Sequence, residues 1–99
     1  MSVEQGDIIK IEKLKGQFLV VSKNFFNETE QVIVCPIVQD TFLEPLHIEI
    51  KTNEMNGIVM CEQMRMIDLR YRGYKKIDRI PYSDIVNITD AIQGIFDYY

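Results

Sequence analysis

The sequence has no tryptophan, one histidine and two cysteines. The small number of histidines and cysteines limits which metal and disulfide sites the chain can form. A single histidine, His47, cannot build a zinc centre from several imidazoles. Cys35 and Cys61 occur in apolar runs without CxxC or CxxH spacing, so we expect two buried reduced thiols rather than a disulfide. These residues therefore predict no metal ion and no other cofactor.

Long apolar runs are missing as well. No stretch reaches the roughly 18 apolar residues that a membrane-spanning helix requires. The opening MSVEQGDIIK has neither the basic start nor the apolar core of a signal peptide, so we expect a cytoplasmic protein that does not use a membrane. With 99 residues, of which 46% are hydrophobic, the chain suits one small packed domain spanning residues 1–99.

Charge is distributed unevenly along the chain. Residues 63–79 contain six basic and two acidic side chains, a net charge of +4, whereas the remainder contains five and thirteen, a net charge of −8. Such a basic segment in an acidic protein fits a polyanion such as nucleic acid, or an acidic protein partner. A hairpin whose charges serve only solubility explains it equally well.

Short strands fill most of the chain. Apolar and charged residues alternate in 6–14 and 46–51, and 18–22 and 31–38 are continuously apolar, which predicts half-buried and fully buried strands respectively. Pro36 places an edge or a bulge near the end of its strand. The segments IVMCEQMRMIDL, read as one long or broken strand, and IDRIP complete the expected sheet.

The C-terminal segment is different. Ile85, Ile88 and Ile92, followed by Ile95 or Phe96, recur at helical spacing, and Ser83 or Asp84 is expected to cap the start of this helix. Tyr98 and Tyr99 would then cover the core or a dimer interface. Several short strands followed by one helix predict a strongly bent antiparallel sheet or barrel with the helix packed on it.

The order of these motifs is similar to that of a known family. GDIIKIEKL, FLVVSKNFFN, VIVCPIV, PLHIEI and above all CEQMRMIDLRYRGYKKIDRIP resemble the MazF/PemK family of bacterial toxins, in its Kid-like branch, over nearly the whole chain. The resemblance implies a mainly β fold with a C-terminal helix: the SH3-like β-barrel of the MazF/PemK (CcdB-like) toxins. It also implies a homodimer, an antitoxin partner with an acidic tail, and metal-free cleavage of single-stranded RNA that leaves a 2′,3′-cyclic phosphate.

Specific residues match the family motif. Glu62 occupies the position of the motif acid, so the implied role is general base for the 2′-hydroxyl, and Arg65 would neutralise the phosphate. A strand carboxylate paired with a nearby arginine is the competing interpretation of Glu62. Residues expected to contact RNA are the motif glutamine and the cations of the basic segment and first turn: Gln63, Arg70, Arg72, Lys75, Lys76 and Lys15.

The sequence also departs from the family pattern. The long loop after the first strand is replaced by the shorter KLKGQF. The catalytic arginine of the family therefore falls on Gly16 or is missing, and Lys15 is the nearest cation. The family threonine falls on Val38, and the arginine before the motif acid falls on Met60. The available substitutes are Gln39, Thr41, His47 and Tyr71.

His47 has a suitable pKa for acid–base chemistry, although the family often has histidine there as an ordinary strand residue. These losses keep three functions open. The chain is a toxin that acts on RNA, a catalytically degenerate relative that binds protein or nucleic acid, or a purely structural dimer.

Overall fold

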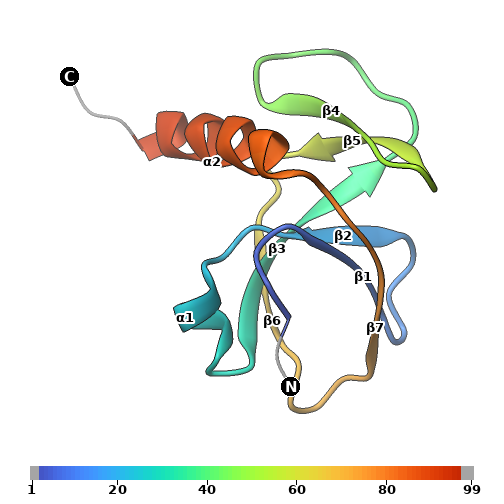
Figure 1. Cartoon of the computed structure of the whole chain (residues 1–99), viewed down its shortest axis with the longest axis vertical. Coiled ribbons are helices and arrows are strands. Elements are labelled where there is room, and N and C mark those ends of the chain that lie inside the picture. Colours follow the sequence, from blue (N-terminus) through green and yellow to red (C-terminus); the bar gives the residue numbers. More distant parts are fainter. Residues whose placement is uncertain (1–2, 97–99) are drawn as a thin grey trace.

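The computed structural model describes residues 3–96, so the expectation for Tyr98 and Tyr99 falls outside the described residues. Short strands come first along the chain and a long helix comes last, as the sequence predicts (Figure 1). The elements are β1 Asp7–Ile11, β2 Gln17–Val20, α1 Asn24–Asn27, β3 Gln31–Val38, β4 His47–Lys51, β5 Asn56–Met60, β6 Arg65–Asp68, β7 Tyr74–Arg79 and α2 Tyr82–Phe96.

The strands form one antiparallel sheet centred on β3. Their order is β4-β5-β3-β2-β1-β7, and β6 pairs with the first half of β3 while β5 pairs with its end. The sheet bends strongly, which confirms the predicted fold class (Figure 1). Within residues 3–96 no pairing joins β7 to β4 or β6, so the bent sheet does not close into a complete barrel.

The predicted strand before the basic segment is broken, and Pro36 lies at the break. β3 pairs with β6 as far as Val34 and with β5 from Ile37 onward, which leaves Pro36 between the two pairings. Proline has no N–H to donate, so it suits a position where one neighbouring strand has ended and the next has not begun. The break also creates the turn after Met60 that carries Glu62.

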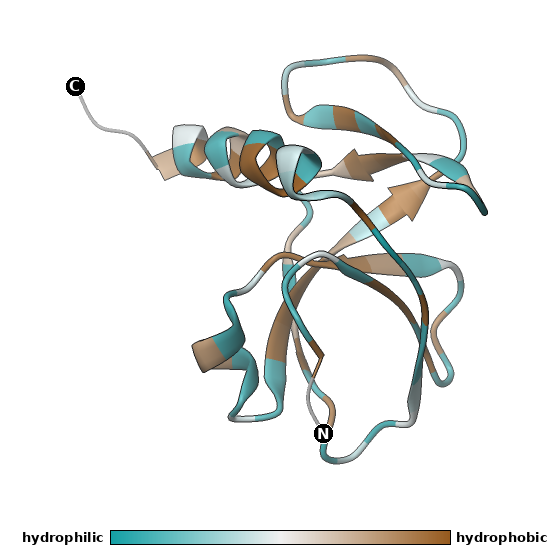
Figure 2. Ribbon diagram, in the orientation of Figure 1, coloured by the Kyte–Doolittle hydropathy of each residue, from teal (hydrophilic) through white to brown (hydrophobic). Residues whose placement is uncertain are grey.

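Both faces of the sheet are buried. Ile8 packs in a cluster with Ile85 and Ile88 of α2, whereas the next residue, Ile9, packs in a second cluster inside the bend. Successive side chains of a strand point to opposite faces, so β1 serves both clusters. β3, in the middle of the sheet, is hydrophobic along most of its length (Figure 2).

The two thiols lie in this core. Cys35 and Cys61 are free and buried, as predicted. Burial raises the pKa of Cys35 to about 12, and it raises the pKa of Cys61 to about 11. Both side chains therefore act as small apolar core residues rather than as nucleophiles.

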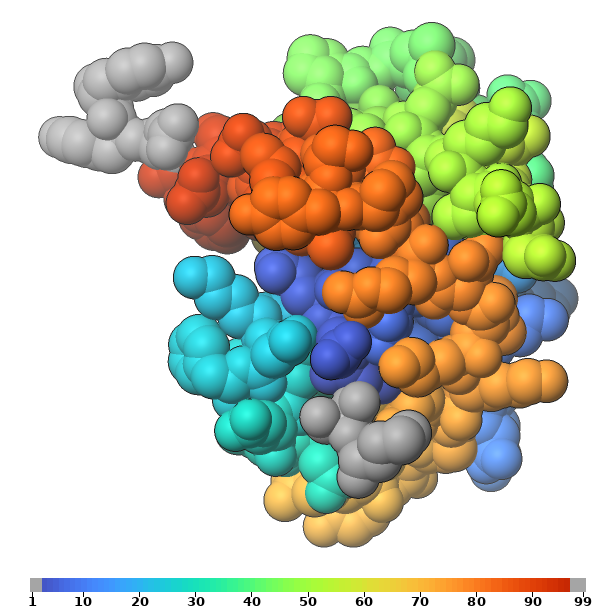
Figure 3. Space-filling model, viewed as in Figure 1, coloured from blue at the N-terminus to red at the C-terminus, as the bar shows by residue number. Residues whose placement is uncertain are grey.

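Helix α2 lies across one end of the sheet (Figures 1 and 3). The residue before its first turn is Pro81 rather than the predicted Ser83 or Asp84, and the carbonyl of Pro81 accepts from the backbone N–H groups of Asp84 and Ile85. Ser83 is consequently inside the first turn rather than before it. Ile85 packs closely on Gly6, whose φ is +96°. A Cβ added to Gly6 would lie only 2.6 Å from Cδ1 of Ile85.

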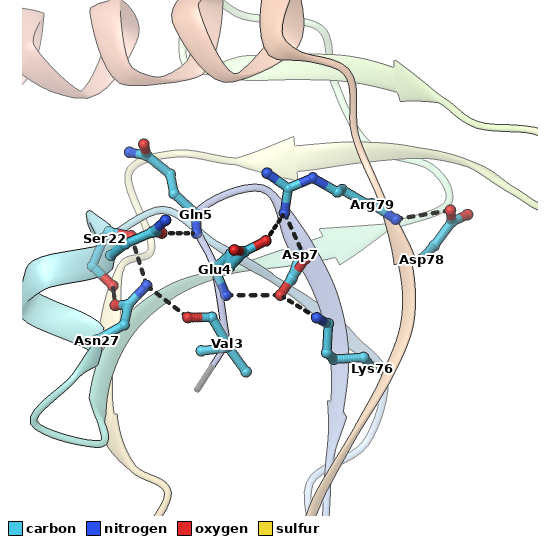
Figure 4. Close-up of polar contacts among 10 residues, drawn as sticks. Val3, Glu4, Gln5, Asp7, Ser22, Asn27, Lys76, Asp78 and Arg79 are labelled. Carbon is cyan, nitrogen blue, oxygen red and sulfur yellow. Dashed lines mark hydrogen bonds and ion pairs between the residues drawn. The ribbon is translucent and has the colours of Figure 1, made fainter. Parts of the chain in front are cut away.

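The segment between β2 and β3 contains the short helix α1. The ring of Phe25 on this helix is 73% exposed and does not attach it to the sheet. Asn27 anchors the segment instead: it is fully buried, accepts from the hydroxyl of Ser22, and donates to the carbonyls of Ser22 and Val3 (Figure 4). A buried asparagine without its partners would be costly, so polar complementarity fixes this helix.

Candidate active site

The first strand of the β4–β5 hairpin places the one histidine beside the motif acid. Nε2 of His47 lies 2.9 Å from Oε2 of Glu62, and Nδ1 lies 2.7 Å from the carbonyl oxygen of Phe42. The imidazole is almost completely buried, whereas the Glu62 side chain is 34% exposed. The pair therefore presents a carboxylate to solvent and keeps its cationic partner inside.

Strand register explains this contact. His47 is opposite Met60 in the β4–β5 ladder, and the N–H of Cys61 donates to the carbonyl of Leu46. β5 ends there, so Glu62 turns out of the strand and meets the ring. The motif carboxylate pairs with a histidine rather than with the arginine expected by the competing interpretation.

The hydrogen bonds of His47 favour an ion pair with Glu62. A carbonyl only accepts, so Nδ1 of His47 carries a proton, and Nε2 can donate to Glu62 only if the ring is an imidazolium. The bond to the Phe42 carbonyl, followed by the bond to Glu62, raises the pKa of His47 above 6.5. The same contact with His47 is the main cause that lowers the pKa of Glu62 below 4.5.

Glu44 adds a second carboxylate to the site. Its Oε1 lies 3.9 Å from Nε2 of His47, and its side chain is 51% exposed. The side chain of Gln63 also helps to lower the pKa of Glu62. A buried imidazole ring thus faces two partly exposed carboxylates, and when the ring is protonated it can hold Glu62 ionised and ready to accept a proton.

The other predicted catalytic residue, Arg65, begins β6 opposite Val34 and is exposed. It forms no ion pair with any other residue in the described range 3–96, so its guanidinium is available to a phosphate. Glu62 lies in the turn and Arg65 in the strand. The break in the strand separates the two residues, and within residues 3–96 no ion pair joins them.

The turn at the centre of the basic segment lies far from Glu62 (Figure 1). Arg70 is held by two hydrogen bonds to Asp68 at 2.8 and 3.0 Å, and its guanidinium lies 5.3 Å from the ring centroid of Tyr71. Figure 1 shows the β6–β7 turn at the opposite end of the molecule from the β4–β5 hairpin. Cations on this turn can therefore contact a long ligand only at a distance from the candidate site.

A buried carboxylate engages two more of these cations. Asp7 is 1% exposed and accepts from Arg79 at 2.7 Å and from the backbone of Glu4 at 2.7 Å (Figure 4). Lys76 lies 3.2 Å from its other side-chain oxygen, Oδ2. Lys76 thus already neutralises an internal charge, and in the described part of the chain Arg72 and Lys75 form no ion pair.

The departures from the family pattern are also visible in space. Gly16 lies in an open turn with a φ of +86° and nothing within 4 Å of an added Cβ, and the neighbouring Lys15 is exposed. Val38 ends β3 half-buried. Of the four possible substitutes, His47 alone contacts Glu62 among the described residues; Tyr71 is 81% exposed on the distant turn.

Within residues 3–96, no group of three histidine, cysteine or carboxylate side chains is arranged to hold a metal ion. In the same range, no helix has the length and apolar character needed to cross a membrane.

The fold and the motif positions agree with a known family. A family model described as PemK-like, MazF-like toxin of type II toxin-antitoxin system matches residues 4–96. The chain belongs to this toxin family. The match of the family model confirms the resemblance that the CEQMR motif and the basic segment indicate. No curated protein matches the sequence significantly.

Solved structures of this family share the fold at low sequence identity. A MazE–MazF crystal structure from Deinococcus radiodurans superposes with a TM-score of 0.87 at 16% identity, covering 97% of both chains. An endoribonuclease in complex with its cognate antitoxin, from a mycobacterial species, gives 0.81 at 15% identity, covering 95% of this chain and 94% of that one. A Mycobacterium tuberculosis MazF toxin gives 0.72 at 19% identity, covering 92% and 97%.

Proposed function

We propose that this toxin-family protein cleaves single-stranded RNA at the His47–Glu62 pair. The observation that carries the proposal is the 2.9 Å contact between the buried imidazole ring of His47 and the partly exposed carboxylate of Glu62. The ion pair keeps Glu62 deprotonated at neutral pH, as a general base must be. A lowered pKa also makes the carboxylate a weaker base, so slow cleavage is expected.

The proposed reaction uses one proton carrier. Glu62 accepts the proton of a 2′-hydroxyl, the 2′-oxygen attacks the adjacent phosphorus, and the bond from phosphorus to the 5′-oxygen breaks. Glu62 then returns its proton to that 5′-oxygen, which leaves a 2′,3′-cyclic phosphate and a 5′-hydroxyl. His47 is a positioning residue because its buried ring orients Glu62 without reaching the substrate. Arg65 would hold the phosphate during attack.

The basic residues would guide the RNA beyond the cleavage point. Arg72 and Lys75 support this role best because neither forms an ion pair with another residue of the range 3–96, and Lys75 lies opposite another lysine, Lys10, in the β1–β7 ladder. Lys15 and Gln63 are exposed and available. Lys76 and Arg70 would contribute less, since Asp7 and Asp68 already neutralise them.

A catalytically degenerate protein that only binds is the second candidate. The substitution of the family arginine and threonine by Gly16 and Val38 favours it, since removing one preorganised donor typically costs about 3 kcal/mol of transition-state stabilisation. In either case we propose an antitoxin partner with an acidic tail, supported by the unpaired cations. We also propose a homodimer, supported by the exposed Ile95 and Phe96 at the end of α2.

Incubation of the purified protein with mixed-sequence single-stranded RNA in EDTA tests the proposal. Wild-type protein should produce 2′,3′-cyclic ends, and Glu62→Gln should lose them, because the amide cannot accept the proton. His47→Gln should retain part of the activity with a changed pH profile. If both wild type and Glu62→Gln leave the RNA intact while sedimentation shows folded dimers, the protein is a binding module.

A further inference from the structure

The loop between β3 and β4 exposes an aromatic ring next to the candidate site. Phe42 is 81% exposed, and its carbonyl oxygen accepts the 2.7 Å hydrogen bond from Nδ1 of His47. One imidazole ring therefore separates the backbone of Phe42 from the carboxylate of Glu62. The loop arches over the end of the β4–β5 hairpin (Figure 1) and forms part of the upper surface in Figure 3.

The fold gains little from this ring. Complete burial of a phenylalanine side chain stabilises a fold by roughly 1.5–3 kcal/mol. Phe42 is 81% exposed, so it contributes little of this stabilisation. Exposed apolar side chains are common by themselves. Phe42 differs because a buried polar group, His47, fixes the backbone that carries it, so the ring is held near the site rather than left to vary with the loop.

Acidic side chains flank the ring. Glu44 follows two residues later, is 51% exposed, and lies 3.9 Å from Nε2 of His47. Asp40 precedes it and is exposed. These carboxylates repel a phosphate backbone, so the loop can accept only a neutral part of RNA. An exposed aromatic face beside a carboxylate suits a nucleobase, which stacks on the ring and donates from an exocyclic amine.

We propose that Phe42 and Glu44 form a base-binding subsite that selects the nucleotide next to the cleaved phosphate. The ring of Phe42 stacks on the base, and the carboxylate of Glu44 accepts from its amine. Bases with an exocyclic amine are therefore preferred over uracil. The inference rests on the proposed action on RNA and adds the chemistry of specificity to it.

The absence of tryptophan from the sequence provides a direct probe. Phe42→Trp introduces a single indole at the subsite, and Phe25→Trp introduces one at a comparably exposed position on α1. Titration with an uncleavable 2′-O-methyl oligonucleotide of mixed sequence should quench the fluorescence of Phe42→Trp and leave that of Phe25→Trp unchanged. Phe42→Ala should weaken binding about ten-fold, and Phe25→Ala should not.

Base selection is tested with oligonucleotides that differ only in carrying cytosine or uracil at one position. Wild type should prefer cytosine by about ten-fold, and Glu44→Gln should reduce this preference while the thermal midpoint is unchanged. RNA that binds equally to wild type and Phe42→Ala, without quenching, overturns the subsite. Quenching of the uncleavable strand without cleavage of natural RNA overturns the proposed catalysis and leaves the subsite in place.

Discussion

The imidazole of His47 donates to the carboxylate of Glu62 across 2.9 Å, although fifteen residues separate them in the sequence. The ring is buried between the Phe42 carbonyl and this carboxylate, and the hydrogen bonds to both raise its pKa. This one contact joins the predicted base, the single histidine and the loop that carries the proposed subsite.

Stability should depend on pH through this pair. The pKa of His47 is raised in the folded protein. Its contribution to folding stability is therefore complete at pH values below the unfolded pKa of about 6.5, and it is lost as the pH rises through the folded pKa. The pKa of Glu62 is lowered, so its contribution is complete above its unfolded value near 4.5 and is lost as pH falls through the folded value. The pair should therefore stabilise the fold most between about pH 4.5 and 6.5.

Histidine NMR titration and thermal unfolding measure these effects. In wild type the His47 resonance should titrate above 6.5, and Glu62→Gln should move its pKa downward. The single histidine makes the assignment unambiguous. An identical titration in both proteins would show that the contact is not formed in solution.

Replacing Asp7 should destabilise the fold. Asp7→Ala removes the buried carboxylate that binds Arg79 at 2.7 Å and the Glu4 backbone at 2.7 Å, and we expect a loss of about 2 kcal/mol in the free energy of unfolding. Arg72→Ala, at an exposed position without an ion pair, should change it by less than about 0.5 kcal/mol. Urea unfolding of the two variants checks the difference, and equal midpoints would contradict it.

Two glycines should respond in opposite directions to the same substitution. Gly6→Ala places a methyl group 2.6 Å from Ile85 at a φ of +96°, so it should cost about 2 kcal/mol. Gly94→Ala adds a methyl group to the open face of α2, where nothing lies within 4 Å, and should stabilise by up to about 1 kcal/mol. Thermal denaturation followed by circular dichroism gives both shifts; a stabilising Gly6→Ala would show that α2 packs differently.

Adjacent lysines should have different roles. Lys75→Gln should weaken binding to single-stranded RNA and lower the slope of log K against log salt by about 0.7, because it removes one phosphate contact. Lys76→Gln should instead lower stability, because it removes a partner of Asp7 at 3.2 Å. Salt-dependent binding and urea unfolding of both variants separate the two effects. A larger RNA effect from Lys76→Gln would reverse the assignment.

The thiols should be inert in the folded protein. Burial raises the pKa of Cys35 to about 12 and that of Cys61 to about 11, so neither is ionised at pH 8. Alkylation at this pH should be slow in buffer and rapid in guanidinium, with two groups modified per chain. Mass spectrometry after timed quenching gives the rates, and rapid modification of the native protein would show that the core opens locally.

Much of the fold could be predicted from local pattern. Alternating and continuous apolar runs predicted β1, β3 and β4, and the spacing of Ile85, Ile88 and Ile92 predicted α2, because a buried face imposes its period on the sequence. Pro36 predicted an edge or a bulge near the end of its strand, whereas the structure places it in the central strand, where the neighbour of β3 changes from β6 to β5. The helix α1 was not predicted, because it depends on the buried bonds of Asn27 to Ser22 and Val3 rather than on local propensity.

The sequence by itself determined the strands, the final helix, the buried thiols and the family motif that contains Glu62. Each of these depends on residue type and on spacing between near neighbours. Only the tertiary structure decided the partners: His47 for Glu62, and Lys76 and Arg79 for Asp7. Strand register and burial decide which distant side chains meet, and no local pattern specifies them. The basic segment is therefore continuous in the sequence, whereas in the folded protein two of its cations, Lys76 and Arg79, neutralise the buried carboxylate of Asp7.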